Sequence, residues 1–245
     1  MIRLSMIMKI VRKDWQDVKS NKQILMPMVI LPVMFSLALP LLLVVLPLMT
    51  ASLENVGAFL ETNINTMIKP FFIMIPLMIT MVTASDSWAG EKERKTAESL
   101  LLLPLTDTEL LVAKVSASFI PGMVITWICG AAVTVMIDVA AFPVINALIL
   151  PDFSWLFLLL VLAPIVAFFS IFLNVWVSYR SRDTKSASQI GGTVILLFVG
   201  FIAGSFFGAS DALPYLYTVV FGVIDILMIK FSPMIFSRES IIAKI

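Results

Sequence analysis

Six long apolar stretches run through this 245-residue chain and leave little of it for anything else. They cover residues 24–49, 68–84, 110–137, 153–177, 188–209 and 213–236. A helix needs about 20 mostly apolar residues to cross the hydrocarbon core of a bilayer. At 60% hydrophobic and 13% charged residues, the chain is also far more apolar than a water-soluble domain, which has about 25% charged residues. We therefore predict an all-α membrane protein with six transmembrane helices in one domain, residues 1–245, and exclude a soluble enzyme.

The basic residues predict how these helices are oriented. Of the 17 Lys and Arg residues, only Lys69 lies outside the N-terminal segment, the connections around spans two to three and four to five, and the C-terminal end. Because basic residues gather on the cytoplasmic side, we expect both termini in the cytoplasm and the chain in the cytoplasmic membrane of the cell. Lys114, at the inner end of the third span, is expected to snorkel toward water. The outer connections, residues 50–67, 138–152 and 210–212, are too short for a folded domain.

The N-terminal segment, residues 1–23, predicts a basic amphipathic helix at the membrane interface. Over residues 4–18 the apolar side chains recur at helical spacing and share one face: Leu4, Ile7, Met8, Val11, Trp15 and Val18. The polar side chains fall opposite: Ser5, Lys9, Arg12, Lys13 and Gln16. A helix of this kind with a Trp lies in the plane of the interface. It either anchors the first span or contacts a partner, and the pattern leaves both roles open.

The densest charge cluster in the chain, residues 86–105, lies between spans two and three. Glu91 is three residues before Arg94 and four before Lys95, which are favourable helical spacings for opposite charges. The segment predicts a short cytoplasmic helix that ends near Pro104, and the alternative is a solvated loop. Thr106 and Glu109 then form a capping-box pattern that restarts a helix for the third span.

The string GEKERKTAESLL at residues 90–101, followed by Pro104 and Lys114, resembles the ABC type-2 transporter permease family. The family pattern is roughly G-E-[KR]-E-[KR]-G-T-x-E-x-L-L-x-x-P and follows the second of six spans. Lys95 stands where the family usually has glycine. The similarity extends to the whole architecture, with an N-terminal amphipathic helix, six spans and this motif in the matching connection.

This resemblance implies a permease subunit that pairs with a second permease chain, itself or a close relative, and docks two cytoplasmic ABC ATPase subunits. The helix at residues 86–105 would be the coupling helix. The implied ATPase contacts are Glu91, Glu93, Arg94, Thr96 and Glu98. Because the chain has no G-x-x-x-x-G-K-[ST] phosphate loop, we expect it to be a transport subunit and no enzyme. ATP and Mg would bind the partner ATPase, with no cofactor on this chain and no nucleic acid partner.

Few residues are available for chemistry inside the membrane. The chain has no histidine and one cysteine, Cys129, which excludes His-ligated metals, His-dependent nucleophiles and disulfides within the chain. Asp225 lies near the middle of the sixth span, where a carboxylate is costly. It is either a site on a substrate or proton path or a structural partner for a neighbouring helix. Gly200, Gly204 and Gly208 recur every four residues, as in closely packed membrane helices, although they also permit a bend.

The leading functional hypothesis is an exporter whose paired chains form the path for an amphipathic or hydrophobic cargo such as a peptide, drug or lipid. Scarce buried charge and small outer connections favour such a cargo, whereas the export direction is implied by the resemblance alone. The alternatives are an ATP-independent carrier or ion channel, or export of an inorganic ion by the same ABC architecture. An intramembrane enzyme has few candidate residues in this sequence.

Overall fold

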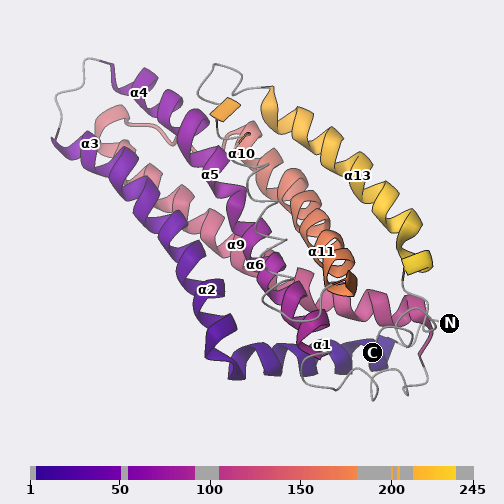
Figure 1. The fold of residues 1–245 in the computed structure, drawn as a ribbon. Coiled ribbons are helices and arrows are strands. Elements are labelled where there is room, and N and C mark those ends of the chain that lie inside the picture. Colours follow the sequence, from indigo (N-terminus) through magenta and orange to yellow (C-terminus); the bar gives the residue numbers. More distant parts are fainter. Residues whose placement is uncertain are drawn as a thin grey trace.

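The computed structural model describes residues 4–50, 55–91, 105–180, 200, 203–204 and 212–235, which are predominantly helical. Helix α1 (Leu4–Ser20) lies across one end of a bundle of long helices that rise from it (Figure 1). We call the end at α1 the foot and the opposite end the far end.

Within the described residues, five helical runs are long and apolar enough to cross a membrane, and they confirm a multi-pass membrane protein. They are Leu25–Thr50, Val56–Ser85, Asp107–Ile145, Phe153–Val177 and Leu213–Lys230. These runs correspond to the predicted spans one to four and six. Most of the predicted fifth span, residues 188–209, lies outside the described residues.

The runs are built from the following helices. The first comprises α2 (Lys22–Val33) and α3 (Leu46–Thr50), and the second α4 (Val56–Asn63), α5 (Lys69–Phe72) and α6 (Met74–Ser85). The third is α9 (Asp107–Ile145), the fourth α10 (Phe153–Phe157) with α11 (Ala163–Arg180), and the last α13 (Leu213–Ile235).

Four π-helical turns join these pieces: Met34–Ala38, Leu41–Val45, Ile64–Ile68 and Leu158–Leu162. Each is followed two residues later by a proline, namely Pro40, Pro47, Pro70 and Pro164. Proline has no N–H to offer the carbonyl four residues earlier, and that carbonyl lies inside the π turn. These four prolines therefore each follow a local widening of the helix, and the chain stays helical through them.

Two predicted outer connections are partly helical. Helix α4 begins inside the predicted connection 50–67, because Asn55 caps it by accepting a hydrogen bond from the Ala58 amide at 3.1 Å. Helix α9 has 39 residues, about 58 Å at the rise of an α-helix, so it overshoots a hydrocarbon core of about 30 Å and continues to Ile145. The predicted connection 138–152 is therefore helical as far as Ile145.

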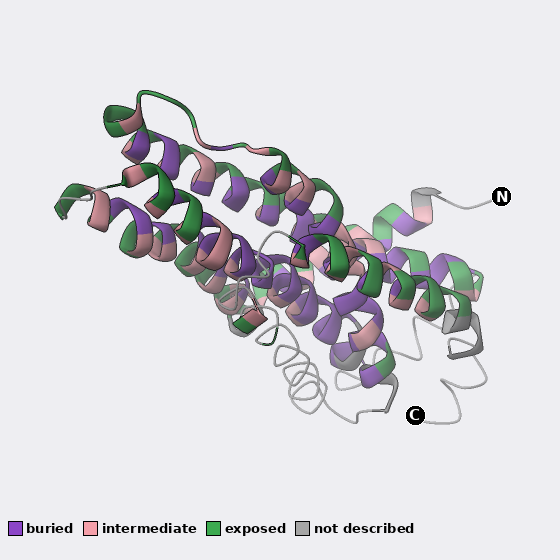
Figure 2. Cartoon of the chain, turned by 90° about the horizontal axis from the view of Figure 1, so that it is seen from above, coloured by how far each residue is buried: buried purple, intermediate pink, exposed green. Residues whose placement is uncertain are grey.

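Helix α6 lies at the centre of the bundle, where it packs against α2, α9 and α11. Buried residues face inward between the helices, and exposed residues line the outer sides (Figure 2). Helices α2 and α13 expose large apolar side chains, among them Ile30 and Ile226, that suit a lipid surrounding. On the inner side, the Ser85 hydroxyl donates to Asn174 Oδ1 at 2.8 Å and ties α6 to α11.

Helices α6 and α9 approach closely at Gly122. A Cβ atom added at Gly122 would lie 2.6 Å from Cγ2 of Thr80, closer than real Cβ contacts allow. Thr80 cannot turn away cheaply, because its side chain is fully buried and its hydroxyl donates to the Pro76 carbonyl at 2.6 Å. Gly130 is similarly close to Leu159, with an added Cβ 2.7 Å from Cδ2. Small residues at helix crossings of this kind let membrane helices pack tightly.

We expect Gly122→Ala to lower the free energy of unfolding by about 1–3 kcal/mol, the usual effect of overpacking. Adding Thr80→Ser, which removes the clashing methyl group, should restore most of the loss. Gly222→Ala is the matched control, because an added Cβ there has no atom within 4 Å. The free energy of unfolding in detergent is measured for the wild type and the three variants. A Gly122→Ala variant as stable as Gly222→Ala would contradict the close approach of α6 and α9.

Candidate functional site

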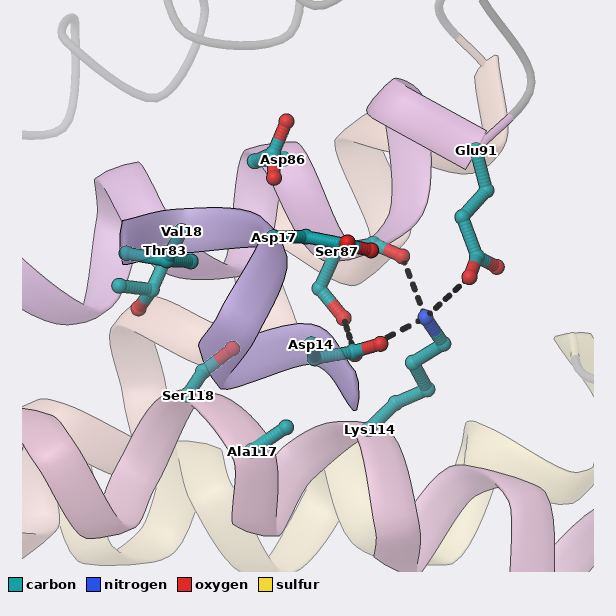
Figure 3. A pocket seen from close by; sticks show the side chains of 10 residues that line it. All are labelled: Asp14, Asp17, Val18, Thr83, Asp86, Ser87, Glu91, Lys114, Ala117 and Ser118. Atoms are coloured by element: carbon teal, nitrogen blue, oxygen red, sulfur yellow. Dashed lines mark hydrogen bonds and ion pairs between the residues drawn. The ribbon is translucent and has the colours of Figure 1, made fainter. Parts of the chain in front are cut away.

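A lysine buried at the foot of the bundle holds three parts of the chain together. Lys114 of α9 is 0% exposed, and its ammonium group has three acceptors (Figure 3). They are Asp14 Oδ2 of α1 at 3.0 Å, Glu91 Oε1 at 2.9 Å and the Ser87 carbonyl at 2.8 Å. The Ser87 hydroxyl also donates to Asp14 Oδ2 at 2.8 Å. An ammonium group has three N–H donors, so these acceptors match its full capacity.

Local structure brings each of these groups to the foot. The predicted capping box is present at the start of α9, where the Thr106 amide donates to Glu109 Oε2 at 2.9 Å. Lys114 follows two turns later on the inner side of that helix. A further π turn, Asp86–Gly90, extends α6 and carries Ser87 and Glu91 past its end.

Asp14 faces inward because the buried side of α1 carries it. Ile7, Ile10 and Val18 are buried on that side, and Asp14 lies one turn from both Ile10 and Val18. Helix α1 packs this side against α9. The side chain of Asp14 therefore enters the same interface as the apolar residues.

Lys13 completes what we call the foot cluster: Lys13, Asp14, Ser87, Glu91 and Lys114. The Lys13 ammonium donates to Glu91 Oε1 at 2.8 Å and lies 3.6 Å from Asp17 Oδ2. Burial lowers the pKa of Lys13, but the hydrogen bond and charge of Glu91 outweigh it and hold this pKa above its ordinary value. Two ammonium groups thus balance the carboxylates of Asp14 and Glu91. Since breaking a buried ion pair leaves an uncompensated charge, the cluster fixes α1 and the Glu91 segment relative to α9.

A small polar cavity adjoins the foot cluster. Its volume is about 10 Å³, about the room of one water molecule. Its wall residues come from α1, the end of α6 and α9: Asp14, Asp17, Val18, Thr83, Asp86, Ser87, Glu91, Lys114, Ala117 and Ser118 (Figure 3). The Ser118 hydroxyl is 1% exposed and has no hydrogen-bond partner among the described residues. The cavity is too small for an organic cargo.

The structure corrects one prediction at the foot. Lys114 does not snorkel to water; it is fully buried because carboxylates from two other segments meet it. The side of the N-terminal helix that packs against the bundle differs in part from its predicted apolar face, since Met8 is 58% exposed while Ile10 and Asp14 are buried. The sequence does hint that Asp14 is buried, because this acidic residue lies one helical turn from both Ile10 and Val18. Its partner Lys114 could not be identified, because it lies 100 residues away in sequence.

Of the predicted coupling residues, the structure describes Glu91 alone, and places it in the foot cluster with 6% exposure. Glu93, Arg94, Thr96 and Glu98 lie outside the described residues, as does most of the predicted helix 86–105. Their contact with an ATPase stays a prediction.

The other predicted membrane residues are not brought to the foot cluster. Asp225 is 7% exposed on α13, and its Oδ1 has no hydrogen-bond partner among the described residues. A Cβ added at Gly200 has no atom of the described residues within 4 Å, and one at Gly204 lies 3.3 Å from Cδ1 of Leu213. Gly208 is not described. Of the described glycines, Gly122 and Gly130 of α9 meet other helices most closely, and they stand eight residues apart instead of in the four-residue glycine repeat of residues 200–208.

A second polar cluster lies at the far end, around Lys69. This side chain is 4% exposed on α5 and donates to Asn65 Oδ1 and Asp152 Oδ2, both at 2.8 Å, and to the Ser154 hydroxyl. Asp152 also caps α10 by accepting from the Trp155 amide at 3.1 Å. Burial raises the pKa of Asp152, but hydrogen bonds and charge from Lys69 and Ser154 hold it below its ordinary value. The cluster joins the second and fourth runs.

We expect Lys114→Met to lower the free energy of unfolding by about 3–5 kcal/mol, because it leaves the buried Asp14 carboxylate without its cation and Glu91 with Lys13 alone. Adding Asp14→Asn and Glu91→Gln should recover part of that loss by removing the stranded charges. Lys230→Met, at an exposed position on α13, serves as the control. If Lys114→Met proves no more harmful than Lys230→Met in detergent unfolding, the buried cluster does not hold the foot together.

Asp152→Asn tests the far-end cluster through pH. Because the folded pKa of Asp152 lies below its ordinary value of 3.8, its stabilisation is complete above that value and is lost as pH falls through the lower folded pKa. The wild type should therefore be more stable than Asp152→Asn at pH 6, and this difference should shrink at pH 3. Asn retains the helix cap, so the change reports the ion pair. Parallel melting curves at both pH values would refute the assignment.

Comparisons with known proteins agree with this architecture. A family described as ABC-2 family transporter protein matches residues 8–219, which include most of α1, the foot cluster and most of the described bundle. The comparison with curated proteins gives no match. The family match covers well over half of the chain and confirms the resemblance found in the motif after the second span. The chain therefore belongs to the ABC-2 family of transporter proteins and is a multi-pass transmembrane permease.

Proposed function

We propose that this permease is the transmembrane subunit of an ABC exporter, works as a dimer and is driven by two separate cytoplasmic ATPase subunits. Family membership implies association with ABC ATPase partners. The observation that carries the proposal is the foot cluster, which ties the first residues of the family motif to two other helices. A homodimer is the simplest assembly, and ATP and Mg would bind the ATPases.

We propose that the foot faces the cytoplasm and that the protein lies in the cytoplasmic membrane with both termini inside. Helix α1, with its basic residues, and Lys114 lie at the foot. At the far end the described basic residue is Lys69, whose charge is paired with Asp152. The uneven distribution of basic residues follows the positive-inside tendency of membrane proteins. The same orientation makes α1 an interfacial helix of the inner leaflet.

The coupling segment would begin directly after Glu91, the foot-cluster residue that precedes it in sequence. Under this proposal Glu93, Arg94, Thr96 and Glu98 contact the ATPase, in the segment predicted as the coupling helix. Glu91 sits at the base of that segment, 2.9 Å from Lys114, so a displacement of the segment reaches α9 through an ion pair. Because Lys114 also holds Asp14, the same displacement reaches α1. We propose that Glu91 positions the coupling segment through its ion pair with Lys114. A direct contact between Glu91 and the ATPase is compatible with this role.

An amphipathic or hydrophobic cargo suits the bundle. Of the buried charged groups in the described spans, Lys69, Lys114, Asp138 and Glu109 have partners of their own. Asp225 differs, because its Oδ1 lacks a partner among the described residues, and we propose it as a residue of the substrate path. Few fixed charges are then left to bind a strongly polar cargo.

We expect Glu91→Gln in the permease–ATPase complex to leave complex formation intact but to reduce cargo transported per ATP hydrolysed severalfold. Lys114→Met should reproduce this uncoupling, because both substitutions cut the same ion pair. The charge reversals Glu93→Lys and Glu98→Lys should instead weaken the complex. Co-purification measures assembly, and vesicle transport with parallel ATP hydrolysis measures coupling.

Two outcomes would overturn the proposal. Full coupling in both Glu91→Gln and Lys114→Met would remove the proposed role of the foot cluster. Cargo movement by the permease alone, without nucleotide, would favour an ATP-independent carrier or channel.

A further inference from the structure

Helix α1 has a second face that the foot cluster does not use. Its exposed basic residues are Lys9, Arg12 and Lys19, and Lys22 at the start of α2 continues the series. We name these four residues the basic face. We propose that the basic face binds the headgroups of anionic phospholipids in the leaflet at the foot. This inference does not depend on ATPase coupling.

The charge of the basic face is not cancelled by acids of its own helix. The acidic residues of α1 point elsewhere: Asp14 pairs with the buried Lys114, and Asp17 lies 3.6 Å from Lys13. Among the described residues the four side chains of the basic face form no ion pair. The foot cluster therefore holds Asp14 on the inner side of α1, while Lys9, Arg12 and Lys19 stay exposed on the outer side. The result is an outward surface that attracts anions.

An apolar flank beside the basic face favours lipid over a soluble partner. Met8 is 58% exposed, and Val11 and Trp15 are partly exposed along the same side of α1. The Lys19 ammonium lies over the Trp15 ring, 5.2 Å from its centroid. A basic strip next to an apolar strip matches the boundary between phosphate groups and acyl chains. Trp is enriched at that same level of the membrane.

The position of α1 sets the depth of the basic face. The helix lies across the foot, and α2 rises from its end (Figure 1). From Lys22 onward, α2 exposes Met26, Ile30 and Val33, so the lipid-facing surface starts where the basic face ends. The four basic residues thus lie at the edge of the hydrocarbon, where lipid phosphates are found. Each basic residue near an anionic membrane surface strengthens binding about fivefold.

Quenching of Trp15 by brominated lipids tests this inference on the full chain in vesicles. The fluorescence of Trp15 is the difference between the wild type and Trp15→Phe, which removes the contribution of the other four Trp residues. Dibrominated phosphatidylglycerol in phosphatidylcholine vesicles should quench Trp15 at a lower lipid fraction than dibrominated phosphatidylcholine does. Because screening shortens to about 3 Å in 1 M salt, the preference should vanish there.

The test variant is Lys9→Gln/Arg12→Gln/Lys22→Gln, which leaves Lys19 on the Trp15 ring. It should reduce the preference for phosphatidylglycerol by up to about 100-fold. The matched control, Lys9→Arg/Arg12→Lys/Lys22→Arg, keeps every charge and should keep the preference.

Four results would overturn the proposal. Equal quenching of the wild type by both lipids would show no anion preference, and a Gln variant that keeps the preference would place it elsewhere. Loss of the preference in the charge-conserving control would show that charge is not its cause. If the Gln variant binds lipid normally but no longer binds the ATPase, the basic face is a protein-docking surface.

Discussion

The structure of the foot depends on one buried ammonium group. Lys114 has no exposed surface, so its charge is tolerable only with acceptors from the chain around it. Those acceptors come from α1 and from the segment beyond α6, which differ from Lys114 by 100 and 27 residues in sequence. If either segment moved away, the buried charge of Lys114 would lose one of its partners. Helix α1 is therefore held by an electrostatic requirement as well as by the apolar contacts of Ile7 and Ile10.

Sequence patterns predicted those features of the fold that depend on residues close together in the chain. Apolar length predicted the described spans, because the bilayer sets how much hydrophobic helix is needed. The Thr106–Glu109 spacing predicted the start of α9, because a capping box is satisfied within four residues. Lys114 was misread for the same reason. A lysine near the end of a span usually snorkels toward water. The residues within a few turns of Lys114 do not indicate that Asp14 will pair with it.

The glycines show the same limit. Gly200, Gly204 and Gly208 form a visible repeat, yet an added Cβ at Gly200 has no atom of the described residues within 4 Å. Gly122 lies in a less visible series of small residues, Ser118, Gly122, Thr126 and Gly130, and its need for a missing Cβ comes from Thr80 on another helix. Close approach depends on which helices cross and at what level, and a helix's own sequence does not contain that information. Tertiary packing thus decides which of several glycines is structurally required.

Two contacts join α6 and α9 at different heights, and together they determine how the pair can move. At the foot, Lys114 binds the Ser87 carbonyl just beyond α6, and two turns along α9 Gly122 lies against Thr80. One contact alone would leave a pivot, whereas two at separate levels resist rotation of one helix against the other. The foot cluster links α1 to the same pair, because Asp14 of α1 also binds Lys114. Helix α13 is far more exposed, and its Asp225 Oδ1 has no hydrogen-bond partner among the described residues.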